Sequence, residues 1–415
     1  MKVSKGILLL VSIIIMMIAF TSFGKVTLSF WVWGPGDLAS KAVAYYNKTS
    51  TTTVVKVRGI VSTSYDAALQ TAMQGGEGPD LMLARPNPVT AEYAKAGMFL
   101  RVDNLISRIK DFPKVLVDSV SYRGKLYAVP SAIQTLQIYY NKDIFEEYNL
   151  KVPHTWAELM NIAKTLKSHG ITPFFATGKE GWALNIIPEV IGATYLGPNY
   201  IKELIDGKKS FTDSRFVGLL KLINSLKPYF QKNFMASSYA DQARAFAFGK
   251  VAMVFDGAWM PIYYLQNNPN LKMGVFPCPP FKEGNKSYIY IYSDGGIAVN
   301  AHSKHVKEAV DFLKWFSSVK GNEIWSKTLG IIPSNPKVKV DPKSEPYVYM
   351  MKELLDNYAL PYTFDYGSPF DAGKPSITSI LIPGLQGMLD GQITPEQLAQ
   401  QIQKGVQQWY KPFQK

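Results

Sequence analysis

Strand-like and helix-like patterns alternate from the start of the folded chain. Val26–Trp33, Val54–Val61 and Pro79–Leu83 are β-branched or apolar runs of strand length. Asp37 is a candidate N-cap for a helix between the first two runs, and a helix ending at Gly75 separates the second from the third. Strands that alternate with helices in this way pair in parallel through crossover helices. The pattern therefore predicts an α/β fold.

The middle of the chain shows the same kinds of signal. Tyr127–Val129 is a short strand that ends at a proline, and Ile133–Tyr140 is a second apolar, aromatic-rich strand. Thr155, followed three residues later by Glu158, predicts a helix that starts with a capping box. Because 415 residues exceed the size at which one core keeps growing, we expect two lobes.

Four separated segments carry a more specific signature. They are GGEGPDLMLA; GKLYAVP with the later YYNKDIFEEYNLKVPHTWAELMNIAKTLK; FAFGKVAMVFDGAWMPIYY; and Gly330-Ile-Ile-Pro-Ser334. Together they resemble the extracellular (periplasmic) solute-binding proteins of sugar ABC transporters, the family 1 proteins that include maltose-binding protein. The resemblance covers almost all of the mature chain.

This resemblance implies a two-lobe periplasmic-binding-protein fold with a hinge and an inter-lobe ligand cleft. Lobe one would comprise residues 25–133 and 297–338, and lobe two residues 134–296 and 339–415. The crossings between them would lie near Ser131–Gln134, Gly295–Ile297 and Val338–Asp341. The implied function is the substrate-binding component of an ABC importer, a monomer that captures a sugar and delivers it to a membrane permease, and not an enzyme.

Residues 1–24 have the layout of a secretory signal peptide. Two lysines precede the apolar run Ile7–Phe20, which is short for a membrane span, and small residues follow it. We expect cleavage after Gly24, no lipid anchor because no cysteine follows the run, and a soluble protein in the periplasm or outside the cell.

Composition is that of an ordinary globular protein, with 47% hydrophobic and 19% charged residues. Formal net charge is +13, and it falls to +11 when Lys2 and Lys5 leave with the signal peptide. The lysines are scattered, and no nucleic-acid-binding motif is present. We therefore expect a basic solvated surface and no nucleic-acid partner.

Motifs for catalysis or metal binding are missing from the sequence. There is no phosphate-binding loop, no GxSxG and no HExxH. His302 and His305 suit a metal only if other ligands join them, and they flank the expected N-cap of a helix that starts at Val306, where exposed polar residues are usual. The single Cys278 is expected to be a buried, inert thiol. We expect neither a cofactor nor a metal.

Candidate ligand residues come from strand ends and from the resemblance. Ligands of open α/β sheets bind beyond the carboxyl ends of the strands, which places Trp33 and Arg85–Asn87 at the cleft. The resemblance places Trp259 flat beneath a sugar ring, two residues after an expected Asp256-Gly257 turn. The full set is Trp33, Arg85, Asn87, Gln134, Trp182, Asp256, Trp259, Asp294, Tyr366, Phe370 and Asp371.

Two other functions remain open at this stage. The aspartates could act as a glycosidase pair, which would make the chain a secreted glycoside-active enzyme. An anionic ligand such as a sugar phosphate would want several basic groups, but Arg85 is the only basic candidate, so a neutral sugar is favoured. Ala84 stands where maltose-binding protein has an aromatic residue and Gln134 where it has an acid, so the sugar itself stays open.

Overall fold

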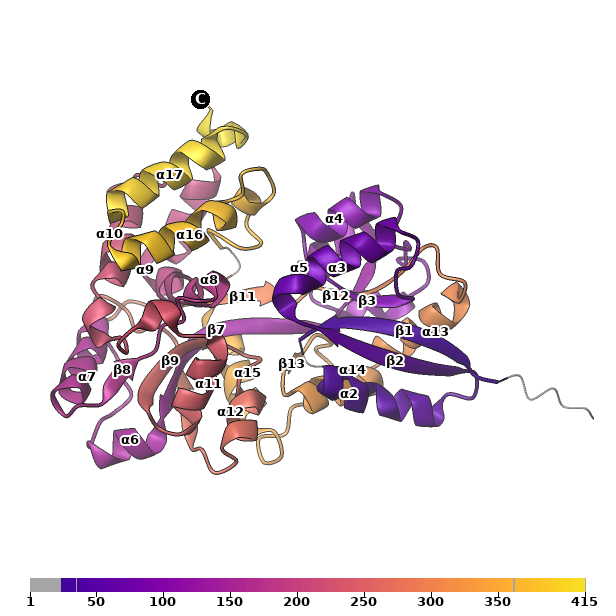
Figure 1. The fold of residues 1–415 in the computed structure, drawn as a ribbon, viewed down its shortest axis with the longest axis horizontal. Coiled ribbons are helices and arrows are strands. Elements are labelled where there is room, and N and C mark those ends of the chain that lie inside the picture. Colours follow the sequence, from indigo (N-terminus) through magenta and orange to yellow (C-terminus); the bar gives the residue numbers. More distant parts are fainter. Residues whose placement is uncertain (1–23, 35, 361–362, 415) are drawn as a thin grey trace, which may run out of the picture.

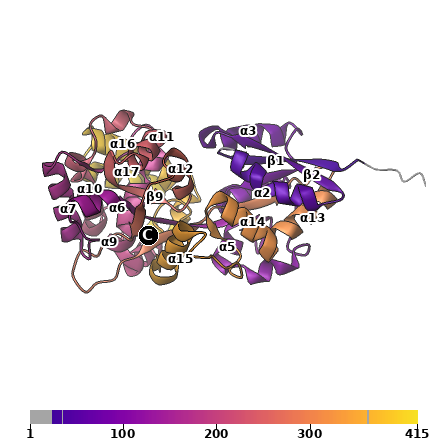
Figure 2. The ribbon, with the colours of Figure 1, turned by 90° about the horizontal axis from the view of Figure 1, so that it is seen from below.

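We describe the protein from a computed structural model, which places residues 24–34, 36–360 and 363–414. Apart from Gly24, the predicted signal peptide lies outside the described residues. Two bodies of mixed helix and sheet lie side by side and are joined by a few strands (Figure 1), and the view from below shows the same division (Figure 2). The predicted two-lobe α/β architecture is confirmed.

The first lobe is built on a five-stranded sheet in the order β2-β1-β3-β12-β6. Its strands are β1 (Val26–Trp33), β2 (Thr53–Ile60), β3 (Leu81–Ala84), β6 (Ala128–Pro130) and β12 (Gly296–Val299). β1 pairs in parallel with β2 and β3, as the alternating pattern predicts, whereas β12 runs antiparallel to β3 and β6. Alternate residues of β1 point into the core, where Phe30 lies 6.0 Å from Phe312 and 6.1 Å from Trp325 between ring centroids.

Helices cover both faces of this sheet (Figure 1). They are α2 (Gly36–Thr49), α3 (Ser62–Gln74), α4 (Pro88–Lys95), α5 (Lys114–Ser119), α13 (Val306–Phe316) and α14 (Val319–Leu329), with the hairpin β4 (Ser121–Tyr122) and β5 (Lys125–Leu126) beside them. The apolar face of α13 is buried at Ala309, Val310, Leu313 and Phe316, and Val306 at its start is partly buried.

The second lobe is built around one long strand, β7 (Ala132–Asn141). Its main sheet has the order β14-β11-β7-β9-β8, and two further strands also pair with β7. The other strands of this sheet are β8 (Thr172–Phe174), β9 (Val251–Gly257), β10 (Met273–Phe276), β11 (Ile289–Ser293), β13 (Ile332–Pro333) and β14 (Ala359–Leu360). Of these, β9, β10, β11 and β13 pair with β7, whereas β8 pairs with β9 and β14 with β11. β11 was not predicted from the sequence.

Helices pack around this second sheet and form its larger core. They are α6 (Lys142–Glu147), α7 (Trp156–Ser168), α8 (Gly181–Leu184), α9 (Ile186–Ile205), α10 (Ser214–Asn224), α11 (Tyr239–Ala247), α12 (Pro261–Asn267), α15 (Pro346–Tyr358), α16 (Ile377–Asp390) and α17 (Pro395–Gln407). α17 starts with a capping box between Thr394 and Gln397. At α7 only half of the predicted box forms: Thr155 accepts from the Glu158 N–H, but the Glu158 carboxylate accepts from the His154 N–H.

Three chain segments meet where the lobes join. Ser131 N–H donates to the Gly295 carbonyl at 3.0 Å, and Ser334 Oγ donates to the Pro130 carbonyl at 2.8 Å. Ile332 pairs with Ile133 of β7. Gly295 has φ +74°, and a Cβ there would lie 1.9 Å from the Ala84 carbonyl oxygen, so this tight passage requires glycine.

The only thiol of the sequence is deeply enclosed. Cys278 is fully buried in the second lobe, and its carbonyl accepts a hydrogen bond from Thr194 Oγ1 at 3.0 Å. Its neighbours Pro279 and Pro280 are buried as well. Burial raises the pKa of the Cys278 thiol.

No helix in the described ranges is both long and apolar enough to cross a membrane. Within the same ranges, no group of three or more potential metal-binding side chains comes together.

Candidate ligand-binding site

Trp259 lies between the two lobes. Its half-buried indole packs against the hydrophobic cores of both. The ring folds back over Gly257, where an added Cβ would lie 1.9 Å from Trp259 Cζ3. One face of the indole is therefore held by backbone, as a stacking platform requires.

Asp256 is placed differently from the sequence-based expectation. The predicted Asp256-Gly257 turn is wrong, because both residues belong to β9, and the Asp256 side chain is fully buried. Its carboxylate accepts from Tyr239 Oη at 2.6 Å, Gln242 Nε2 at 2.6 Å, Tyr264 Oη at 2.5 Å and its neighbour's N–H at 2.8 Å. Burial raises the pKa of the Asp256 carboxyl, and the four hydrogen bonds oppose this effect only in part, so the pKa is about 6. With four donors in place, it has no free lone pair to offer a ligand.

A row of aromatic side chains runs across the second lobe. We define this aromatic row as Trp182, Tyr239, Trp259, Tyr292 and Tyr366. The Trp182 and Tyr239 ring centroids lie 4.7 Å apart, Trp259 Nε1 donates to Tyr239 Oη at 2.6 Å, and the ring of Tyr292 lies 6.4 Å from Trp259 and 5.9 Å from Tyr366. Trp182 is 38% exposed, and Trp259, Tyr292 and Tyr366 are partly exposed.

Two members of the aromatic row, Tyr239 and Tyr292, are absent from the sequence-predicted set. The signal for Tyr292 is the alternating run Tyr288, Tyr290, Tyr292, which puts three phenols on one face of a strand. Tyr239 is the first residue of α11, and its sequence gives no comparable signal.

The first lobe contributes Trp33, Arg85 and Asn87, all near strand ends. The Arg85 guanidinium lies 4.3 Å from the centroid of the Trp33 ring and makes an ion pair with Asp66 at 3.2 Å. Burial lowers the pKa of Arg85, but Tyr366, Asp66 and Asp294 raise it above its ordinary value overall. Its charge is thus close to groups of the second lobe and the junction.

Asn87 reaches across to the second lobe. It adopts φ +53° at the start of α4, and its Nδ2 donates to the Gly367 carbonyl at 3.3 Å. Gly367 adjoins Tyr366, so this bond links the polar strand ends of one lobe to the aromatic row of the other.

Gln134 and Asp294 lie together at the junction. Gln134 Nε2 donates to Asp294 Oδ2 at 3.2 Å, while the buried Gln134 Oε1 has no hydrogen-bond partner among the described residues. Burial raises the pKa of Asp294 to about 6, although Gln134 and Arg85 lower it. Two or more ligand hydroxyls could donate hydrogen bonds to the unpaired amide oxygen and to the remaining lone pairs of Asp294.

Two other candidates make contacts within the second lobe. Phe370 is fully buried in the second-lobe core, where its ring stacks on Phe413 with centroids 5.6 Å apart. Asp371 accepts a hydrogen bond from Thr378 Oγ1 at the start of α16. Both lie in or beside a short 3₁₀ turn, which the sequence suggested only as a loop.

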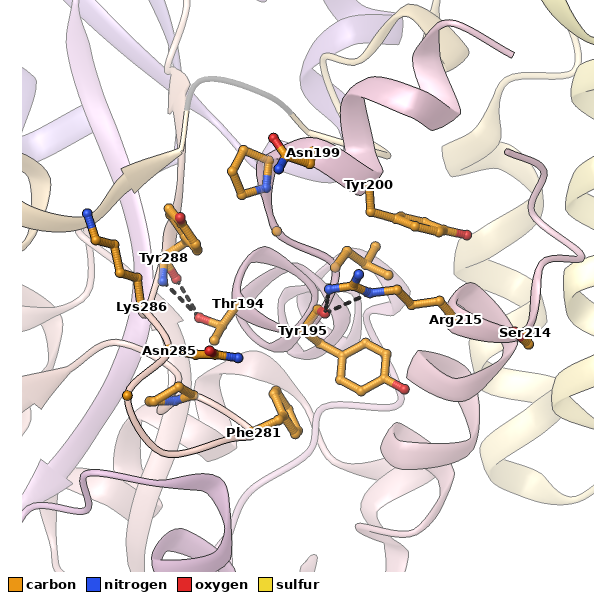
Figure 3. A pocket seen from close by; sticks show the side chains of 15 residues that line it. Thr194, Tyr195, Asn199, Tyr200, Ser214, Arg215, Phe281, Asn285, Lys286 and Tyr288 are labelled. Atoms are coloured by element: carbon orange, nitrogen blue, oxygen red, sulfur yellow. Dashed lines mark hydrogen bonds between the residues drawn. The ribbon is translucent and has the colours of Figure 1, made fainter. Parts of the chain in front are cut away.

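A separate pocket of about 790 Å³ lies on the second lobe, at the kink of α9 (Figure 3). Pro188 lies in the first turn of α9, where the missing N–H costs little, and the helix bends at Gly197, which has φ +72°. Arg215 donates to the Tyr195 carbonyl at 2.8 Å on one side of this pocket. None of the sequence-predicted ligand residues lines it.

Several known proteins are similar to this chain in sequence or in fold. Residues 41–352 match the family described as bacterial extracellular solute-binding protein. The multiple sugar-binding protein of Streptococcus mutans is 26% identical over 333 residues, 78% of each chain. An uncharacterised ABC transporter extracellular-binding protein of Pyrococcus horikoshii is 26% identical over 294 residues, 69% of this chain and 65% of that relative. The solved structure of a chitin oligosaccharide binding protein superposes with a TM-score of 0.78 at 23% identity, over 93% of this chain and 99% of the other.

Proposed function

Because the chain belongs to the bacterial extracellular solute-binding protein family, we propose that it captures a neutral sugar or oligosaccharide between its lobes and delivers it to the membrane permease of an ABC importer. The observation that carries this proposal is the aromatic row, with the polar group of Gln134 and Asp294 at its edge. Sugar rings have apolar C–H faces and a polar rim. Flat side chains combined with a few fixed hydrogen-bonding groups complement such a ligand.

Charge at the site supports a neutral ligand over a sugar phosphate. Arg85 is the one basic side chain among the candidate residues, and it is already paired with Asp66 and stacked on Trp33. Asp294 lies nearby and would repel an anion. The overall charge of +11 says little about this site, since salt screens charges beyond about 8 Å.

Glycoside hydrolysis is disfavoured by what the carboxylates do. A glycosidase needs two of them facing the same bond. Of the three candidate aspartates, Asp256 accepts four hydrogen bonds inside the core and Asp371 accepts one from Thr378, so only Asp294 pairs with another candidate residue, Gln134. The family consists of binding proteins, and we extend that non-enzymatic role to this chain.

Export and closure complete the proposal. The protein would lose residues 1–24 on secretion and act as a monomer outside the cytoplasm. The three segments at the junction would let the lobes rotate towards each other, and a sugar touching both would stabilise the closed form.

A thermal-shift screen tests the function. We would compare raffinose, maltotriose, xylotriose and chitotriose with glucose 6-phosphate, and assay aryl-glycoside hydrolysis in parallel. A neutral sugar present at 100 times its Kd should stabilise the protein by about 2.7 kcal/mol. No shift with any neutral sugar, a larger shift with the phosphate, or turnover of an aryl glycoside would overturn the proposal.

A further inference from the structure

Tyr239 joins both tryptophans of the aromatic row to a buried carboxylate. Its Oη accepts the indole N–H of Trp259 at 2.6 Å and donates its own proton to Asp256 Oδ1 at 2.6 Å. Its ring also meets Trp182 edge-on, with centroids 4.7 Å apart. We propose that Asp256 and Tyr239 are positioning residues that fix the planes of Trp259 and Trp182 before a sugar binds, a role that rests on the proposed function.

The carboxylate is a fixed anchor for this chain of hydrogen bonds. Asp256 Oδ2 accepts from Gln242 Nε2 and Tyr264 Oη, and Oδ1 accepts from the Gly257 N–H as well as from Tyr239. These donors come from α11, α12 and β9, so three elements hold one side chain. Hydrogen bonds to a charged acceptor are short and strong. The phenol oxygen of Tyr239 is therefore held in place, with a lone pair available for the indole.

A second restraint acts on the tyrosine through its backbone. Tyr239 is the first residue of α11, and its N–H donates to Glu180 Oε2 at 2.9 Å. Glu180 directly precedes α8, the short helix that carries Trp182. The start of one helix is thus tied to the start of the other, and Tyr239 lies between the two tryptophans.

Preorganisation explains why such a chain would matter for binding. A free indole on a loop would lose rotamer freedom when a sugar stacks on it, which weakens binding. Trp259 loses this freedom on folding instead, because Gly257 supports its face and Tyr239 holds its edge. Removing the Tyr239 hydroxyl should break the hydrogen bond that holds the Trp259 indole N–H. Sugar binding should then weaken about three- to tenfold, the scale of one lost hydrogen bond.

The chain offers a matched pair of variants. Tyr239→Phe and Tyr264→Phe each remove one hydroxyl from the same Asp256 carboxylate, but Tyr264 packs against Tyr139 and Phe246 rather than against the tryptophans. Both should lose stability, and Tyr239→Phe should lose somewhat more, because the Tyr239 hydroxyl also accepts the Trp259 indole N–H. Only Tyr239→Phe should remove the hydrogen-bond acceptor of the Trp259 indole N–H.

The first readout needs no sugar. The Trp259 indole N–H signal is assigned in a ¹H–¹⁵N spectrum by its loss in Trp259→Phe, and its solvent exchange is then measured. We expect a shifted signal and at least about tenfold faster exchange in Tyr239→Phe, with neither change in Tyr264→Phe. An unchanged signal in Tyr239→Phe, or equal changes in both variants, overturns the positioning role.

The second readout is calorimetry with the tightest binder among raffinose, maltotriose, xylotriose and chitotriose. Weaker binding in Tyr239→Phe alone supports the inference, and equal loss in both variants contradicts it. If none of the four binds the wild type, the proposed sugar specificity fails, and the indole signal alone decides the positioning role.

Discussion

Replacing Gly257 by alanine should displace Trp259 without unfolding the protein. A Cβ at position 257 would lie 1.9, 2.1 and 2.3 Å from three carbons of the Trp259 ring. Carbon atoms in contact normally stay about 3.5–4.0 Å apart, so the ring must retreat by roughly 1.5 Å. The retreat also pulls Nε1 away from Tyr239 Oη, now 2.6 Å distant.

The size of the effect follows from these two losses. Overpacking of this kind costs about 1–3 kcal/mol, and the lost hydrogen bond costs about 1 kcal/mol. Together they remain below the roughly 5–15 kcal/mol that stabilises a typical domain. The fold should survive, whereas a platform displaced into the ligand's space should bind sugar at least about tenfold more weakly, or about 1.4 kcal/mol.

The assay pairs calorimetry with chemical unfolding and uses a matched glycine as control. A Cβ on Gly387 in α16 would make only ordinary contacts at 3.7 Å and beyond. Gly387→Ala should therefore keep full affinity and gain about 0.5–1 kcal/mol of stability, because alanine is the better helix residue. Unchanged sugar affinity in folded Gly257→Ala would refute Trp259 as the stacking platform.

Four further predictions can be tested directly. Trp259→Ala should weaken sugar binding by about 1–3 kcal/mol, the scale of burying a large side chain, and calorimetry showing equal affinity would count against it. The pKa of Asp294 is raised to about 6 in the folded state, so its ionisation destabilises the native protein as pH rises through 6. Asp294→Asn should then gain stability relative to wild type between pH 4.5 and pH 7.5 in urea unfolding, and a constant difference would contradict this. Small-angle scattering should give a smaller radius of gyration with a bound sugar than without, and an unchanged radius would argue against closure. Intact mass of the exported protein should show Lys25 as its first residue, and a mass that includes Met1 would disprove cleavage.

Local patterns in the sequence account for much of the fold. Val26–Trp33 forms a strand with the expected bounds, and the expected strand Ile133–Tyr140 lies within β7. Both have a strong internal signal, since β-branched and aromatic residues are concentrated in them. Such signals depend on nearby residues only, so they can be recognised without knowing the rest of the structure.

The turn predicted at Asp256-Gly257 is wrong because its outcome depends on residues that are distant in sequence. Asp-Gly after an apolar strand is ordinarily a turn, since a carboxylate seldom stays buried. Here Tyr239, Gln242 and Tyr264 supply donors from two helices that pack beside the strand. Only tertiary structure brings these donors together, so the sequence next to Asp256 could not reveal its burial.

The same reasoning explains why the burial of Phe370 could not be predicted from the sequence. Its loop lies between helices, and a phenylalanine in a loop could face either solvent, ligand or core. Packing against Phe211 and Phe413, which are distant in sequence, decides for the core. By contrast, Arg85 and Asn87 were predicted from the strand-end rule, and both do lie opposite groups of the second lobe.

The enclosed thiol of Cys278 has a practical consequence for measuring domain motion. Thiol reagents attack the exposed thiolate, and this side chain is fully buried with its ionisation suppressed. A cysteine introduced on the surface of each lobe would therefore react with a spin label or fluorophore, while Cys278 would remain unlabelled. The wild-type background needs no cysteine removal, and distances between paired labels could follow opening and closing in the otherwise native chain.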